Sequence, residues 1–90
     1  MHLSEKRQPL LNRVRRIAGQ LEAVERALLE EADCATTLQR VAAVRGAVNG
    51  LLDEIVADHL QEHVARPGLS DAERAAGAGE LIAVIRRYSN

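Results

Sequence analysis

The chain has 90 residues, a net charge of −1 at pH 7, one cysteine, and one tyrosine as its only aromatic residue. This length allows one domain over residues 1–90, and the remaining Ala, Leu, Val and Ile are typical of helices that pack on one another. The single cysteine excludes an intrachain disulfide framework, and no apolar run approaches the roughly 18 residues of a membrane span. We therefore expect a soluble, cytoplasmic protein that does not enter the membrane.

Two long helices are predicted first along the chain. The first covers about residues 8–30, behind an extended arm over 1–7, because its apolar residues recur at alternating spacings of four and three. The second covers about residues 34–65, with Asp33 as a plausible N-cap, and it is apolar over most of its circumference.

A third, shorter helix is predicted over about residues 71–88. It follows a capping box in which Ser70 is the N-cap and Glu73 occupies the third helical position. The fold class is therefore all-α, with three helices in each protomer. Because the two long helices cannot cover each other's apolar surface within one chain, we infer at least a dimer in which helices of two chains form a bundle.

Three potential metal ligands share one stripe of the second helix. Steps of about 100° per residue place Cys34, His59 and His63 on this stripe, although about 38 Å separates Cys34 from His59 along one helix. In an antiparallel, two-fold pair of helices, Cys34 of one chain would face both histidines of the other. A thiolate with two imidazoles suits Ni(II), Co(II), Zn(II), Cu(I) or Cu(II), and His2 could add a fourth ligand from the arm. A buried structural cysteine and a solvated histidine pair are the alternative interpretations.

Residues 12–64 resemble the CsoR/RcnR/FrmR family of bacterial metal- and aldehyde-sensing transcriptional repressors. The most specific pieces are "RVRRIAGQ" (13–20), Cys34 and "LQRVAAVRGAVNGLL" (38–52). The resemblance implies a three-helix protomer, an antiparallel four-helix-bundle dimer, and a dimer of dimers, that is, a homotetramer. It also implies that the ligand-free protein binds double-stranded operator DNA and that ligand binding releases the DNA.

Members of this family differ at four positions, which here are His2, Cys34, His59 and His63. This set resembles the nickel- and cobalt-responsive RcnR branch, which implies Ni(II) or Co(II) as the ligand ahead of Zn(II) or Cu(I). The formaldehyde-responsive FrmR branch is the main alternative, because the central part of the second helix resembles it. Its chemistry resembles a cross-link between the cysteine and a proline amine at position 2, where this chain has histidine.

The basic side chains are concentrated at the start of the chain. Residues 1–20 carry five basic and one acidic side chain, whereas the other 70 residues carry seven basic and twelve acidic ones. This asymmetry favours an anionic partner, and the lack of an aromatic platform disfavours single-stranded nucleic acid. Following the resemblance, we expect six cations to contact the phosphates of duplex DNA: Lys6, Arg7, Arg13, Arg15, Arg16 and Arg45.

Two other classes of function fit these residues less well than a repressor. Cys34 and His59 could imitate a nucleophile and its base, but the sequence offers no third orienting group and no oxyanion loop, so we do not expect an enzyme. A purely structural oligomerisation module would explain the heptad spacing, but it would explain neither the basic start nor the stripe of ligands.

Overall fold

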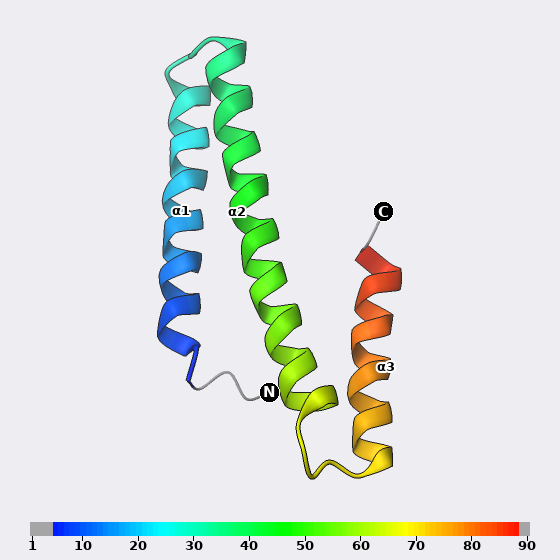
Figure 1. Ribbon diagram of the computed structural model, residues 1–90. Coiled ribbons are helices and arrows are strands. Elements are labelled where there is room, and N and C mark those ends of the chain that lie inside the picture. Colours follow the sequence, from blue (N-terminus) through cyan, green and yellow to red (C-terminus); the bar gives the residue numbers. More distant parts are fainter. Residues whose placement is uncertain (1–4, 89–90) are drawn as a thin grey trace. The chain divides into compact units, whose positions relative to one another are not determined.

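The computed structural model describes residues 5–88, and every regular element in this range is a helix (Figure 1). The elements are α1 (Arg7–Leu29), α2 (Cys34–Leu60), the π-helical turn η1 (Gln61–Ala65) and α3 (Asp71–Tyr88). The predicted all-α protomer with three helices is thereby confirmed. The chain divides into two compact units, and the boundary between them lies within α2, after Leu52.

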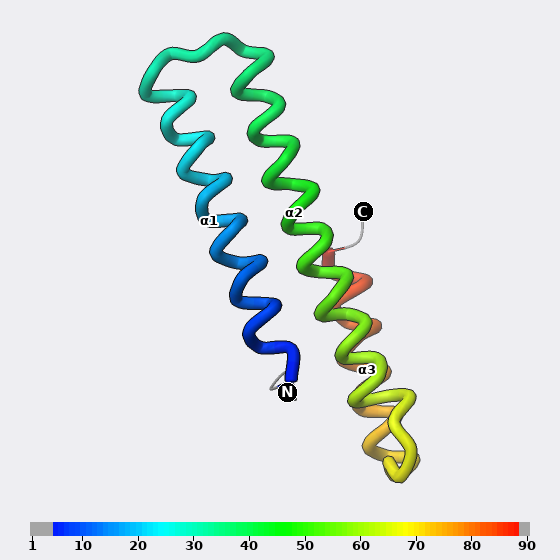
Figure 2. The backbone as a smooth tube through the Cα atoms, turned by 60° about the vertical axis from the view of Figure 1, so that its left-hand side comes forward, coloured from blue at the N-terminus to red at the C-terminus, as the bar shows by residue number. Residues whose placement is uncertain are grey.

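The first unit is a helical hairpin. Within it, α1 and the first part of α2 lie side by side and run in opposite directions (Figures 1 and 2). Pro9 lies in the first turn of α1, where its missing N–H removes no intrahelical hydrogen bond. Arg40 of α2 ties the two helices together, since its Nη1 donates a hydrogen bond of 3.0 Å to the carbonyl oxygen of Ala23.

The hairpin turns through a Schellman motif that has a glutamate in the left-handed position. The Ala32 N–H donates to the Ala27 carbonyl at 2.9 Å, and the Glu31 N–H donates to the Leu28 carbonyl at 3.4 Å. Glu31 has φ 54°, the backbone conformation in which glycine is usual because it has no Cβ. The last carbonyls of α1 are therefore paired, at the expense of local strain at Glu31.

Asp33 is the N-cap of α2, as the sequence predicted. Its Oδ1 accepts a hydrogen bond of 2.8 Å from the Thr36 N–H, and its carbonyl oxygen accepts one of 3.1 Å from the Thr37 hydroxyl. The hydrogen bonds from Thr36 stabilise the ionised carboxylate and so hold the pKa of Asp33 below its ordinary value of 3.8.

The second unit begins at Asp53 and contains the end of α2, η1 and α3. The sequence predicted one helix as far as about residue 65, but the α-helical pattern ends at Leu60 and the wider turn η1 follows. Gly68, with φ 87°, reverses the chain before α3. The predicted capping box is present, since Glu73 Oε1 accepts from the Ser70 N–H at 2.9 Å and Ser70 Oγ accepts from the Glu73 N–H at 3.0 Å.

Little apolar surface is buried within the protomer. Over residues 5–88, the buried hydrophobic side chains are those of Ile17 and Ala27. An apolar stripe on α2 is instead between 44% and 66% exposed: Leu38, Val41, Val48 and Leu52. None of the helices in this range combines the length and the apolar character that crossing a membrane requires.

Candidate metal and nucleic-acid sites

Two of the predicted ligands, His59 and His63, lie against each other at the junction of α2 and η1. Their ring centroids are 4.8 Å apart, and the ring planes are inclined by 43°. Both residues are half-buried, in keeping with their spacing of four residues on one helical face. The structure therefore brings together the imidazole pair that the sequence predicted.

The His59 ring is anchored on α3. Its Nε2 lies 2.9 Å from the carbonyl oxygen of Gly77 and 4.0 Å from Oε2 of Glu80. Because a carbonyl oxygen only accepts, Nε2 carries the proton, and Nδ1 of neutral His59 is left with the lone pair. Histidines that bind metals are typically held in this way, with the second ring nitrogen donating to a carbonyl or a carboxylate.

The backbone of His63 is packed directly against α3. A Cβ atom built on the buried Gly77 would come within 2.8 Å of both the carbonyl carbon and the Cβ of His63, and it would overlap the His63 carbonyl oxygen. A side chain at position 77 would therefore displace η1 or α3. Because glycine has no side chain, η1 and α3 can pack closely at this point.

Arg74 of α3 donates hydrogen bonds to backbone carbonyls at the C-terminal end of η1. Its Nη1 donates to the carbonyl oxygen of Val64 and, at 3.5 Å, to that of Arg66, while its Nη2 lies 3.5 Å from the carbonyl oxygen of Leu69. The carbonyls of Val64 and Arg66 lie at the C-terminal end of η1, where a cation both pairs them and complements the helix dipole. Glu62 adds an exposed ion pair with Arg66, at 3.8 Å.

The other two predicted ligands are Cys34 and His2. Cys34 is the first residue of α2, is exposed and belongs to the first unit, and His2 lies outside the described residues. Within residues 5–88, no three histidine, cysteine or acidic side chains are grouped so that they could hold a metal ion. The donor chemistry of the pair nevertheless fits a borderline transition metal, since the two imidazoles are adjacent and His59 has the outer hydrogen bond expected of a ligand.

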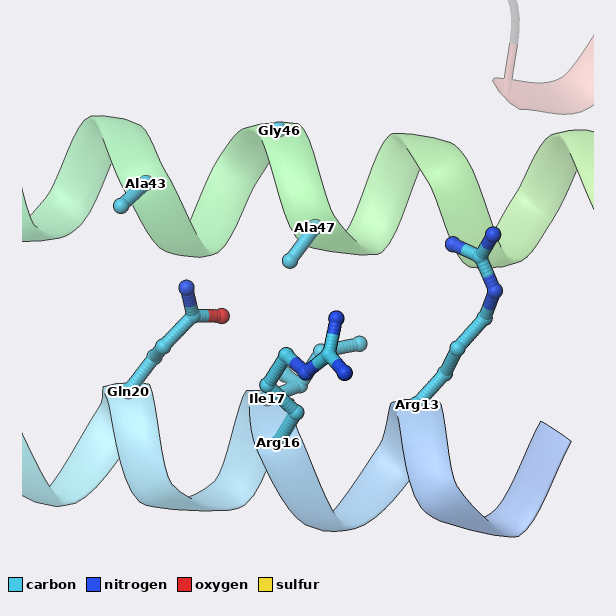
Figure 3. A pocket seen from close by; sticks show the side chains of 7 residues that line it. All are labelled: Arg13, Arg16, Ile17, Gln20, Ala43, Gly46 and Ala47. Carbon is cyan, nitrogen blue, oxygen red and sulfur yellow. The ribbon is translucent and has the colours of Figure 1, made fainter. Parts of the chain in front are cut away.

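Two of the six predicted DNA-contacting cations line a cavity in the hairpin unit. Arg13 and Arg16 project from α1 towards α2, around a space of about 260 Å³ (Figure 3). The remaining lining residues are Ile17, Gln20, Ala43, Gly46 and Ala47. The small residues of α2 leave room between the helices for both guanidinium groups.

Gly50 is another small residue of α2, and it lies close to Arg13. A Cβ at Gly50 would lie 3.1 Å from Nη1 of Arg13, so the guanidinium group approaches the backbone of α2 closely. In the same unit, the buried Oε1 atom of Gln20 has no hydrogen-bond partner within the described part of the chain. The other predicted cations do not line the cavity: Arg7, Arg15 and Arg45 are exposed, and Lys6 is half-buried.

Sequence reasoning missed the contribution of α3 to the histidine pair. Gly77, Glu80 and Arg74 all contact the segment that carries the histidines, but no spacing or motif connects them with residues 59–63. A glycine inside a predicted helix was the one available signal, because glycine is unfavourable there unless packing requires it. Gly79 is also inside α3, and a Cβ built there would meet open space, so that signal does not tell the two glycines apart.

Comparison with known proteins extends the likeness over nearly the whole chain. Residues 6–87 match the family model described as metal-sensitive transcriptional repressor. Two relatives align over 87 residues, 97% of this chain and 96% of their own length. One is an uncharacterized protein in the bioA 5′ region of Serratia marcescens, at 44% identity, and the other is the transcriptional repressor RcnR of Salmonella arizonae, at 38%.

A solved structure is similar as well. It is a variant of the formaldehyde-responsive regulator FrmR from Salmonella enterica serovar Typhimurium, with 43% sequence identity and a TM-score of 0.88. The match covers 98% of this chain and 99% of that one. The chain thus belongs to the family of metal-sensitive transcriptional repressors, which are not enzymes.

Proposed function

We propose that this protein is a repressor that binds operator DNA without metal and releases it when it takes up Ni(II) or Co(II). The observation that carries the metal proposal is the His59–His63 pair, with ring centroids 4.8 Å apart and His59 Nε2 directed at the Gly77 carbonyl. Membership of the family supports the response to metal, and the ligand set His2, Cys34, His59 and His63 favours Ni(II) or Co(II) over Zn(II) or Cu(I).

The proposed site lies between subunits. Cys34 begins α2, and His59 is its penultimate residue, so a rise of about 1.5 Å per residue keeps them far apart within one helix. An antiparallel partner would place its own Cys34 near the histidine pair. The exposed apolar stripe of α2 supports such a partner, because a surface of this kind is stabilised when a second helix covers it.

The DNA-binding surface is proposed to centre on the cavity side of α1. Arg13 and Arg16 line one space and are both exposed, and guanidinium groups are typical ligands of DNA phosphates. The general physics of release is a coupling free energy, typically about 1–3 kcal/mol, between the metal and DNA sites. Ligation that draws the His2 arm and the end of α2 together would change the spacing of the arginines at the start of α1.

Anaerobic titration of the reduced protein with Co(II) and Ni(II), followed by absorbance, tests the metal site. We expect a sulfur-to-metal charge-transfer band that saturates near one metal per protomer, disappears in Cys34→Ala and changes in His63→Ala. Octahedral-type Co(II) bands support the nickel and cobalt assignment, whereas intense tetrahedral bands would support zinc. Absence of binding at micromolar concentrations would refute metal sensing by this site.

Salt dependence of operator binding tests the DNA surface. A variant that neutralises one phosphate fewer has a slope of log K against log salt that is smaller by about 0.9. In Arg13→Ala and Arg16→Ala, we expect a decrease of about 0.9 for each subunit that contacts the DNA. We expect no change in Arg26→Ala, which alters a cation at the far end of α1. Equal slopes in all three variants would place the DNA-binding surface elsewhere.

Formaldehyde sensing is the second candidate, and the similarity to the FrmR variant favours it. The exposed Cys34 thiol would be the nucleophile, and an amine of the same or a neighbouring chain would complete a methylene bridge with loss of water. The test is release of operator DNA by formaldehyde in the presence of a chelator, together with the mass increase of one methylene bridge. Both should be abolished in Cys34→Ala, and DNA release by Ni(II) without any response to formaldehyde would exclude this candidate.

A further inference from the structure

We propose that Gly77 of α3 is a positioning residue that sets both histidines of the metal site. The proposal deepens the proposed function, on which it rests for its consequence in metal binding. Its claim about the metal-free protein can be tested separately. At Gly77, α3 meets His59 through a hydrogen bond and His63 through backbone contact.

The first role of Gly77 is to orient His59. Its carbonyl oxygen accepts from Nε2 of His59 at 2.9 Å, which fixes both the ring orientation and the position of the proton. Nδ1 is then available for a metal without any change of tautomer, so the ligand is prepared before metal arrives. Oε2 of the exposed Glu80, one helical turn further on, lies 4.0 Å from the same nitrogen, which is beyond hydrogen-bond distance.

The second role depends on the missing side chain. A Cβ at position 77 would overlap the carbonyl oxygen of His63 and lie 2.8 Å from the Cβ of His63. Because these are backbone and near-backbone atoms of a packed turn, no rotation of a flexible side chain could relieve the overlap. Replacing the glycine must therefore move η1, with His63, away from α3, and it must move the adjoining His59 ring away from the carbonyl of residue 77.

Gly79 provides a matched control in the same helix. A Cβ there meets nothing within 4 Å, and the substitution by alanine has the same size and the same favourable effect on helix propensity. Gly77→Ala and Gly79→Ala thus differ in whether the new methyl group meets the histidine segment. A difference in the behaviour of His59 between the two variants reports that packing.

The first measurement uses the full-length, metal-free protein labelled with ¹⁵N-histidine. In the wild type and in Gly79→Ala, we expect the His59 Nε2–H proton to be protected from solvent exchange and to show a nuclear Overhauser effect to the Hα atoms of Gly77. In Gly77→Ala, that proton should exchange rapidly, and the Overhauser effect to residue 77 should disappear. If Gly77→Ala does not fold, the wild type decides the question, because a rapidly exchanging or Nδ1-protonated His59 overturns the proposal.

The second measurement is the competitive Co(II) affinity and absorption spectrum of the same variants. Loss of a hydrogen bond to a metal ligand typically weakens metal binding roughly 10- to 100-fold. Gly77→Ala keeps the carbonyl but moves it away from His59, so we expect a decrease of this size with altered Co(II) bands in that variant. Gly79→Ala should have the affinity and spectrum of the wild type. Identical Co(II) binding by both variants would overturn the role of Gly77 in the site.

The two measurements separate failure of the inference from failure of the proposed function. If the wild type binds neither Co(II) nor Ni(II), metal sensing fails, while a protected His59 proton that depends on Gly77 still supports the positioning of His59. If the wild type binds metal but the His59 proton behaves alike in the wild type and in Gly77→Ala, metal sensing stands and the inference is wrong. Denaturant unfolding of each variant shows that a folded protein was compared.

Discussion

Individual residues at the turn between α1 and α2 carry both strain and stabilisation. Among residues 5–88, Glu31 is the non-glycine residue with positive φ, at 54°, and it occupies the position of the Schellman motif that glycine usually takes. Two residues later, Asp33 caps α2 with a side-chain hydrogen bond to the Thr36 N–H. The turn therefore combines a strained backbone conformation at Glu31 with a stabilising N-cap at Asp33.

Replacing Glu31 by glycine should stabilise the protein. Glycine reaches the left-handed region without the steric strain of a Cβ, which for other residues is roughly 1–2 kcal/mol, partly offset by the greater freedom of glycine in the unfolded chain. We expect Glu31→Gly to raise the free energy of unfolding by about 0.5–1 kcal/mol in denaturant titrations. Glu30→Gly is the control, because Glu30 has φ −86° and its replacement should lower stability.

The cap at Asp33 predicts a dependence of stability on acid. Since hydrogen bonding lowers its folded-state pKa below 3.8, the stabilisation is fully present above that value and is lost as the pH falls through the lower folded-state pKa. Asp33→Asn can still accept from the Thr36 N–H but does not titrate. The melting temperature of the wild type should therefore fall more steeply than that of Asp33→Asn below about pH 4, and parallel profiles would contradict this assignment.

At the scale of elements, local signals predicted the helix ends better than the packing between helices. The capping box of Ser70 and Glu73 and the N-cap at Asp33 depend on residues three apart, and both are present in the structure. The change from α2 to η1 was not predicted, because η1 packs against α3 and the residues of α3 that contact it are distant in sequence. The adjacency of His59 and His63 followed from helical periodicity, whereas their support by Gly77 did not.

The connection between η1 and α3 should depend on Arg74. Its guanidinium group donates hydrogen bonds to the carbonyl oxygens of Val64, Arg66 and Leu69. A hydrogen bond that involves a charged group contributes about 1.5–3 kcal/mol to stability. We expect Arg74→Met to lower the free energy of unfolding by about that amount and to speed amide exchange in η1.

Arg66→Met is the matched control for this prediction. It removes an exposed ion pair with Glu62, and such pairs contribute roughly 0–1 kcal/mol. Equal decreases of stability in the two variants would show that Arg74 acts only as a surface charge.

At the scale of the whole molecule, the exposed stripe of α2 is the main indication that the protomer does not act as a monomer. Val41, Val48 and Leu52 are each close to half exposed, and complete burial of such a side chain is worth about 1.5–3 kcal/mol. The sequence predicted such a surface, because the second helix is apolar over most of its circumference and the first helix cannot cover all of it. The number of chains that cover it is not encoded in the spacing, because the same stripe serves a dimer and a larger bundle.

A charge on this stripe should disrupt the assembly. We expect sedimentation to show the wild type as a dimer or tetramer and Val48→Asp as monomers with reduced helix content. Gln39→Asp adds the same charge at an exposed position on the opposite side of α2, because steps of about 100° per residue place it roughly 140–180° from Val41, Val48 and Leu52. It should leave the assembly intact. A wild type that sediments as a monomer would refute the proposed partner, and with it the site between subunits.

The small buried core, Ile17 and Ala27 among the described residues, has a consequence for the amount of protein in a cell. A protomer that completes its core only against another copy folds and assembles in one equilibrium, so its melting temperature rises with total concentration. Chains made at low abundance would spend more time open to proteases than chains made at high abundance. The concentration of folded, assembled repressor would then increase more than in proportion to the rate of synthesis.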